Sequence, residues 1–165
     1  MQFFDRVGFP KVYNLNYQNM GLIPEIVNEM IHKISLIFKE YEPKIIHVMN
    51  RSDVHSDHRF TFVTFASCTK TFRYPLVKEV LMYESISEIE FEPMLLEKGS
   101  QTNYFVAFSD FFKKKIEILQ IYLSELGEHP FLRRSRNIEA LAVHRGASIE
   151  TEYAEAFQLI KFLDK

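Results

Sequence analysis

Two histidines and two aspartates lie close together in the stretch MNRSDVHSDHRF, residues 49–60. They are Asp53, His55, Asp57 and His58. Imidazole and carboxylate groups are ligands that zinc takes from proteins, and the same groups act as general acids and bases. Aspartate is also common at the first turn of a helix, where it caps backbone N–H groups. The cluster therefore indicates either a metal-dependent site or the polar cap of a helix.

The hydrophobic pattern predicts the elements that position this cluster. Apolar residues recur at three- and four-residue steps from Ile23 to Tyr41, which predicts a helix, and Pro43 ends it. The segments 11–17 and 44–50 on either side are typical of strands, so this part of the chain is a predicted strand, helix, strand unit. The cluster then follows the carboxyl end of a strand, where open α/β sheets bind their ligands.

The rest of the chain alternates in the same way. Helices are predicted over 57–72, 110–126 and 135–146, and Gly127 is the expected stop of the second. Strands are predicted over 77–85 and 104–109. Residues 86–103 are predicted to form an irregular connection, and residues 151–163 have no clear type. This order predicts an α/β fold with a Rossmann-like, mainly parallel sheet flanked by helices. No Gly/Pro-rich linker divides the sequence, so residues 1–165 are predicted to form a single domain.

Composition excludes several classes of protein. The 165 residues carry a net charge of -2, which gives no general attraction to nucleic acid. No apolar run reaches the roughly 18 residues that a membrane span needs. The single cysteine, Cys68, cannot form an internal disulfide and is expected to be buried, and the N-terminus lacks the pattern of a signal peptide. The sequence therefore predicts a soluble, cytoplasmic protein that binds neither nucleic acid nor membrane.

Two motifs carry a resemblance to a known family. HSDHR, residues 55–59, resembles the H-P-D-H-R element of the PIG-L/LmbE family of zinc-dependent de-N-acetylases, with Ser56 where proline is usual. EALAVHRG, which ends at Gly146, followed by YAEAF, resembles the stretch with which many of these enzymes close. The resemblance implies a hydrolase that removes the N-acetyl group from an amino-sugar conjugate, such as a glycolipid, thiol cofactor or antibiotic precursor, and releases acetate.

The resemblance also implies a role for each residue of the cluster. His58 would be a zinc ligand, His55 would stabilise or protonate the tetrahedral intermediate, and Asp57 would orient a neighbouring group. These roles suit the chemistry because zinc brings the pKa of bound water to about 7 and the charged intermediate needs a donor. The candidate substrate-binding residues are Asp53, Arg59, Arg145 and Glu155. An Asx-type turn is the alternative for Asp53, and an ion pair or helix-end contact is the alternative for Arg145 and Glu155.

One element of that family has no counterpart in the sequence. The family carries an A-H-P-D-D-E element at the end of its first strand, which supplies two further zinc ligands and the general base; EHPF at 128–131 is no substitute, because no acids follow its proline. The chain thus resembles the C-terminal two thirds of a deacetylase without the first strand. We expect weak zinc binding and no activity for the chain alone. We also expect association into a homo-oligomer or with a complementing N-terminal chain, because a strand edge would be exposed.

Two other functions are open on the sequence alone. A degenerate relative could keep the crevice and act as a sugar-binding or scaffold protein without catalysis, and the missing acidic element favours this for the isolated chain. A different metal-dependent hydrolase, such as a phosphoesterase, could use the same cluster. Such enzymes draw further carboxylates and histidines from other strand ends, and the sequence shows no second cluster.

Overall fold

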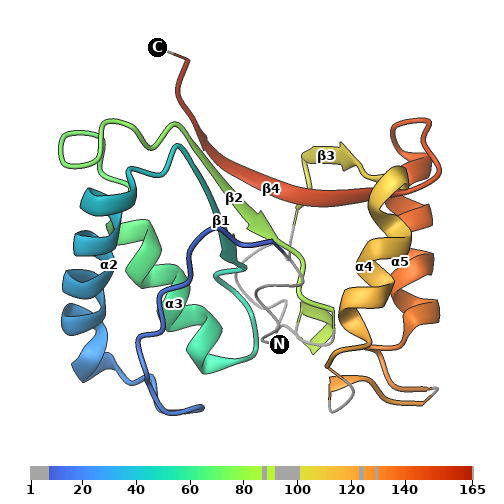
Figure 1. Ribbon diagram of the computed structural model, residues 1–165, viewed down its shortest axis with the longest axis horizontal. Helices are drawn as coiled ribbons and strands as arrows, with labels where there is room; N and C mark the ends of the chain where they lie inside the picture. Colours follow the sequence, from blue (N-terminus) through green and yellow to red (C-terminus); the bar gives the residue numbers. More distant parts are fainter. Residues whose placement is uncertain (1–7, 87–88, 92–100, 123–124, 129, 165) are drawn as a thin grey trace. The chain divides into compact units, whose positions relative to one another are not determined.

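The computed structural model describes residues 8–86, 89–91, 101–122, 125–128 and 130–164 (Figure 1). Contacts between residues divide the chain into two compact units. The first unit holds Met1–Leu15 and Phe105–Glu155, and the second holds Asn16–Tyr104 and Ala156–Lys165. The single domain predicted from the sequence stays a prediction.

Among the described residues, the second unit contains two α-helices, two short 3-10 helices, two parallel strands and most of a further strand. Its elements are the short 3-10 helix η1 (Pro24–Ile26), α2 (Val27–Tyr41), β1 (Ile45–Met49), α3 (Ser56–Ser67), β2 (Glu79–Tyr83) and the 3-10 helix η2 (Ile89–Phe91). Pro24 lies in the first turn, and α2 ends where Glu42 takes the left-handed conformation at φ 51° just before Pro43. The helix predicted from Ile23 to Tyr41 and the strands predicted over 44–50 and 77–85 are confirmed.

The first unit contains α4 (Ser109–Leu119) and α5 (Ser135–Ala147), and β3 (Tyr104–Ala107) and β4 (Ala154–Phe162) each run from one unit into the other. The four strands have the order β1-β2-β4-β3. β1 is parallel to β2, with Val48 opposite Met82, whereas β4 is antiparallel to β2, with Gln158 opposite Met82. The predicted α/β class is confirmed, and the expected mainly parallel sheet is a mixed one because β4 returns in the opposite direction.

The core of the second unit is formed by α2, α3 and the sheet. Figure 1 shows α2 and α3 side by side next to β1, and contacts join α2 to α3 and α3 to β1. Side chains alternate along a strand, so Ile46 and Val48 of β1 share a face with Val80 and Met82 of β2. Each of these side chains is buried, which stabilises the fold by about 1.5–3 kcal/mol per residue. Buried on the helices and the connection between them and β2 are Met30, Ile34, Phe38, Thr64, Cys68 and Tyr74.

In the second half of the chain, one predicted helix differs from the structure and one segment without a predicted type is a strand. The helix predicted over 110–126 ends at Leu119, so the expected stop at Gly127 is wrong. Hydrogen bonds from Ile121 N to Ile118 O and from Tyr122 N to Leu119 O continue the chain as tight turns. These hydrogen bonds join residues three positions apart, so apolar side chains recur at nearly helical spacing after the helix has ended. Residues 151–163, which had no clear type, contain β4.

Two predicted elements of the first half of the chain also differ. Residues 11–17 form no strand, and Asn16 has a left-handed backbone with φ 55°, which breaks an extended run. The helix predicted over 57–72 ends at Ser67, where the hydroxyls of Ser67 and Thr69 donate to helix carbonyl oxygens. Part of the irregular connection predicted over 86–103 lies outside the described residues.

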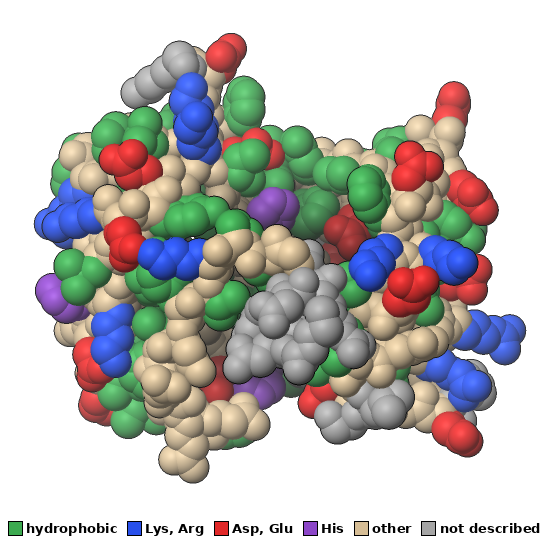
Figure 2. Space-filling view, viewed as in Figure 1, with side chains coloured by type: hydrophobic (Ala, Val, Ile, Leu, Met, Phe, Trp, Pro, Cys, Tyr) green, Lys and Arg blue, Asp and Glu red, His purple; other side chains and the backbone are tan. Residues whose placement is uncertain are grey.

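The surface agrees with the near-neutral composition. On the face seen in Figure 2, basic and acidic side chains are interspersed over both units. None of the described helices is long and apolar enough to cross a membrane.

Gly146 is needed where the chain folds back after α5. A Cβ at this position would meet Thr151 O at 2.5 Å and Glu152 O at 2.7 Å. The turn is closed by a hydrogen bond of 3.1 Å from Thr151 N to Gly146 O, and Glu150 within it has a left-handed φ of 58°. The glycine of the HRG motif is therefore required by the fold, because two backbone carbonyl groups approach it too closely for a side chain.

We expect Gly146→Ala to lower the free energy of unfolding by about 1–3 kcal/mol, because the new methyl group must displace backbone rather than a flexible side chain. Urea unfolding followed by circular dichroism measures this change. Ala140→Ser, at an exposed position of the same helix, is the control and should cost about 0.5 kcal/mol or less. Equal losses in the two variants would contradict the steric explanation.

Candidate active site

The histidine cluster lies in the turn that joins β1 to α3, at the carboxyl end of β1 as predicted. His55 is the N-cap of α3, with an extended backbone at φ -72° and ψ 121°. Its Nδ1 accepts a hydrogen bond of 3.2 Å from Asp57 N. The helix begins at Ser56, one residue before the predicted start, and an imidazole rather than the side chain of Asp57 caps it.

Asp53 organises the turn from a fully buried position, with a relative exposure of 0%. Its Oδ1 accepts from His55 N at 2.8 Å, which is the Asx-type turn considered from the sequence. Its Oδ2 lies 2.7 Å from His58 Nδ1. Since a carboxylate accepts hydrogen bonds, the neutral form of His58 carries its proton on Nδ1 and keeps a lone pair on Nε2. Carboxylate groups orient metal-binding imidazoles in this way.

His55 has the opposite arrangement of its ring proton. Its Nδ1 accepts the Asp57 amide, so the neutral ring carries its proton on Nε2. The two imidazole rings stack with centroids 4.7 Å apart and an angle of 25° between their planes. The turn therefore presents an acceptor nitrogen on His58 beside a donor nitrogen on His55.

Asp57 reaches away from the turn to a distant part of the chain. Its Oδ2 accepts from Met20 N at 2.8 Å and its Oδ1 from Leu22 N at 3.2 Å. The group that Asp57 orients is thus the backbone that enters η1. The catalytic role predicted for Asp57 stays a prediction.

The other predicted site residues have contacts of their own. Arg59 Nη1 donates to the carbonyl oxygens of Asp53 at 2.7 Å and Val54 at 2.6 Å, so it braces the turn from outside. Arg145 on α5 and Glu155 on β4 belong to the first unit, and Glu155 Oε1 accepts from Lys115 Nζ at 2.6 Å. The substrate contacts predicted for these residues and for Asp53 stay predictions.

Asn50 and Tyr83 were missed in the sequence. Asn50 is 2% exposed, and it holds the start of the turn through hydrogen bonds from Ser52 N to its Oδ1 (2.9 Å) and from Asp53 N to its carbonyl oxygen (3.3 Å). Burial and, second, the negative charge of Asp53 raise the pKa of Tyr83, so its hydroxyl stays protonated at neutral pH. The available signal for Asn50 was a polar residue at the end of an otherwise apolar strand.

The described residues do not by themselves make a zinc site. Catalytic zinc takes three protein ligands and a water, and this turn offers one imidazole nitrogen with a suitable tautomer. Within the part of the chain that the structure describes, no group of three or more His, Cys, Asp or Glu side chains could hold a metal ion. Further donors would have to come from other residues.

No protein-family model matches the sequence, and no curated protein matches it. The fold does match solved structures. An N,N'-diacetylchitobiose deacetylase from Pyrococcus horikoshii has a TM-score of 0.73 at 17% identity, over 96% of this chain and 60% of its own. A conserved protein from Thermus thermophilus has a TM-score of 0.72 at 17% identity, over 99% of this chain and 71% of its own.

A third structure, the zinc-inhibited form of a teicoplanin deacetylase, has a TM-score of 0.60 at 16% identity, over 93% of this chain and 61% of its own. At these identities the likeness shows a shared fold, and function has to be argued from the site. The fold is thus one that these two deacetylases also have. The present chain spans about three fifths of the length of the two named deacetylases.

The tautomer of His58 tests the role of Asp53. In Asp53→Asn, the amide oxygen can still accept from His55 N, but the amide N–H would donate to His58 Nδ1 and move the ring proton to Nε2. We expect two-bond couplings in a ¹H–¹⁵N spectrum of the imidazoles to show this exchange. Zinc affinity should fall about 10- to 100-fold, because the lone pair has moved off Nε2.

Asp57→Asn is the matched control, since it removes the same charge four residues away. It should leave the His58 tautomer as it is, because the Asp57 carboxylate bonds to Met20 and Leu22 rather than to an imidazole. An unchanged His58 tautomer in Asp53→Asn would refute the positioning role of Asp53.

Proposed function

We propose that this protein is, or forms part of, a zinc-dependent hydrolase of the PIG-L/LmbE type that removes the N-acetyl group from an amino-sugar conjugate. The observation that carries the proposal is the hydrogen bond between Asp53 and His58, which leaves His58 Nε2 unprotonated and ready to bind a metal. The fold shared with deacetylases supports it, as do the HSDHR and HRG motifs.

Each histidine has one role in this proposal. His58 is a metal ligand, and bound zinc would supply an acidified water and polarise the amide. His55 donates from Nε2 to the amide oxygen as this oxygen gains negative charge in the tetrahedral intermediate. The stacking of the two rings, with centroids 4.7 Å apart, supports the proposal that both act on one small acyl group.

Neither carboxylate of the turn is available as a general base. Asp53 is fully buried and already accepts from His55 N and pairs with His58. Both oxygens of Asp57 accept backbone N–H groups. The base that takes the proton from the attacking water, like the remaining metal ligands, therefore comes from residues outside this turn.

The sheet suggests where such residues attach. In the strand order of the described residues, β1 is an end strand and pairs with β2 on one side. The strand that leads into the histidine turn thus offers a free edge for pairing. We propose that a complementing segment or a second subunit binds there and completes the site, in the cytoplasm.

Acetate release tests the proposal in protein expressed from its natural reading frame, including any residues encoded before Met1. With zinc and N-acetylated amino sugars such as N,N'-diacetylchitobiose, we expect kcat/KM to fall by at least about 100-fold in His58→Ala. In His55→Ala, kcat should fall by about 10²–10³ through loss of one oxyanion donor.

His32→Ala, which removes an exposed histidine of α2, is the matched control and should keep full activity. Equal activity in wild type and His58→Ala, or no acetate release from any N-acetylated amino sugar with zinc present, would overturn the proposal.

A further inference from the structure

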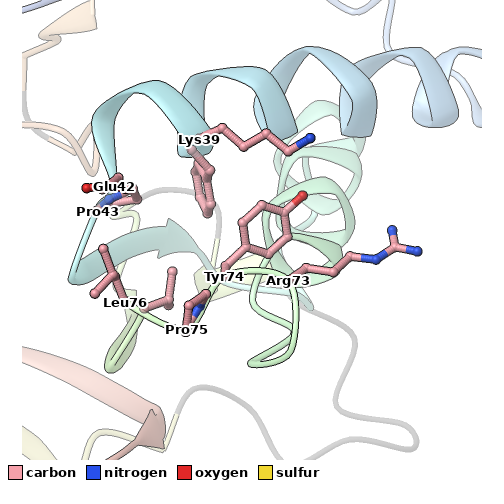
Figure 3. Close-up of a pocket in the computed structure, with 9 residues that line it drawn as sticks. Lys39, Glu42, Pro43, Arg73, Tyr74, Pro75 and Leu76 are labelled. Atoms are coloured by element: carbon pink, nitrogen blue, oxygen red, sulfur yellow. The ribbon is translucent and has the colours of Figure 1, made fainter.

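A small cavity lies in the second unit at the amino ends of β1 and β2, whereas the histidine turn follows the carboxyl end of β1 (Figure 3). Its volume is about 150 Å³. Pro43, just before β1, and Val77, just before β2, line it. Phe38 of α2, Pro75 and Leu76 supply the other apolar walls. Leu76 is 39% exposed, so the apolar lining reaches the surface of the protein.

The walls of this cavity are held in place by contacts within the chain. Phe38 and Tyr74 meet edge to face with ring centroids 5.7 Å apart, and the hydroxyl of Tyr74 donates to Ser35 Oγ at 2.6 Å. Pro43 and Pro75 each have a backbone φ fixed by the proline ring. Among the described residues, no buried polar atom without a partner lines the cavity. A preformed cavity of this kind favours an apolar group of matching size.

Phe72 has the size that this cavity holds. An apolar cavity of about 150 Å³ in another protein binds benzene, which has the size of the phenylalanine ring. Phe72 is 80% exposed, the highest fraction among the large apolar side chains of the described residues. It is adjacent in sequence to Arg73, which lines the cavity. An exposed aromatic ring beside an apolar cavity indicates an interaction surface.

The charged side chains around the cavity have a self-complementary arrangement. Glu42 lies at one end, and Figure 3 shows the charged ends of Lys39 and Arg73 pointing away from it. Within the described part of the chain, none of these three side chains forms an ion pair. The guanidinium carbon of Arg73 lies 5.7 Å from the centroid of the Phe72 ring, so the ring and the positive charge share one end. Across a two-fold axis, the positive end of each copy faces the negative end of the other.

We propose that this surface is a symmetric interface between two copies of the chain, in which Phe72 of each copy enters the cavity of the other and Arg73 pairs with Glu42 of the other copy. Two rings and two ion pairs are few contacts for an interface, so the dimer is reversible and dissociates on dilution. The surface is distinct from the free edge of β1, and the interface does not depend on the proposed function.

Sedimentation equilibrium of the full chain over a concentration series tests the interface. We expect a monomer–dimer equilibrium for the wild type. Phe72→Ala should raise its dissociation constant by at least about 100-fold, because each dimer loses two buried rings. Phe111→Ala removes a ring of α4 that is 68% exposed, and it should leave the dissociation constant unchanged. A wild-type chain that stays monomeric at millimolar concentration, or equal effects of the two variants, would overturn the proposal.

An exchange of charges tests the orientation of the two copies. Glu42→Arg and Arg73→Glu each place like charges opposite one another twice, so either variant alone should be monomeric. An equimolar mixture of the two variants should form a heterodimer, because each contact then joins one positive and one negative side chain again. Both positions are exposed, and circular dichroism should show an unchanged fold. A mixture that stays monomeric, or a single variant that dimerises as tightly as the wild type, would refute this arrangement.

Discussion

The hydrogen bond between the buried carboxylate of Asp53 and His58 Nδ1 determines the chemistry of the histidine turn. A charged group with no exposed surface is very unfavourable unless its oxygens are bonded. Residues of the same turn supply these hydrogen bonds: His55 N donates to Asp53 Oδ1, and His58 Nδ1 pairs with Asp53 Oδ2. Arg59 donates to the backbone carbonyl oxygen of Asp53. The geometry of both imidazoles therefore follows from the need to stabilise one buried charge.

The result is a pair of neighbouring rings that carry their protons on different nitrogens. His58 has a free acceptor nitrogen and His55 a free donor nitrogen, although both have the same side chain and lie three residues apart. What separates them is the partner of Nδ1, which is a carboxylate in one case and an amide N–H in the other. Under the proposed function this arrangement would be only one part of a hydrolytic site, since both carboxylates of the turn already accept hydrogen bonds within the protein.

Much of this could be predicted from the sequence, and the limits have physical reasons. The periodicity of α2 and the apolar runs of β1 and β2 are local signals, so these elements were found. The direction of β4 depends on the strand that it pairs with, and hydrophobic periodicity carries no information about strand pairing. The end of α4 was missed because tight turns after Leu119 keep nearly the same spacing as a helix. The cluster itself was evident, but the pairing of Asp53 with His58, and of Asp57 with Met20, depends on side-chain conformations in the folded turn.

The two aspartates of the turn differ in how far along the chain they reach, and this has a consequence for folding. Asp53 bonds to residues two and five positions away, so its loop can close within the unfolded chain at small entropic cost. Asp57 bonds to residues 35 and 37 positions away, which requires α2 and α3 to be in place first. We therefore expect the histidine arrangement to need little of the fold in order to form, and its attachment to the segment before α2 to form later in folding.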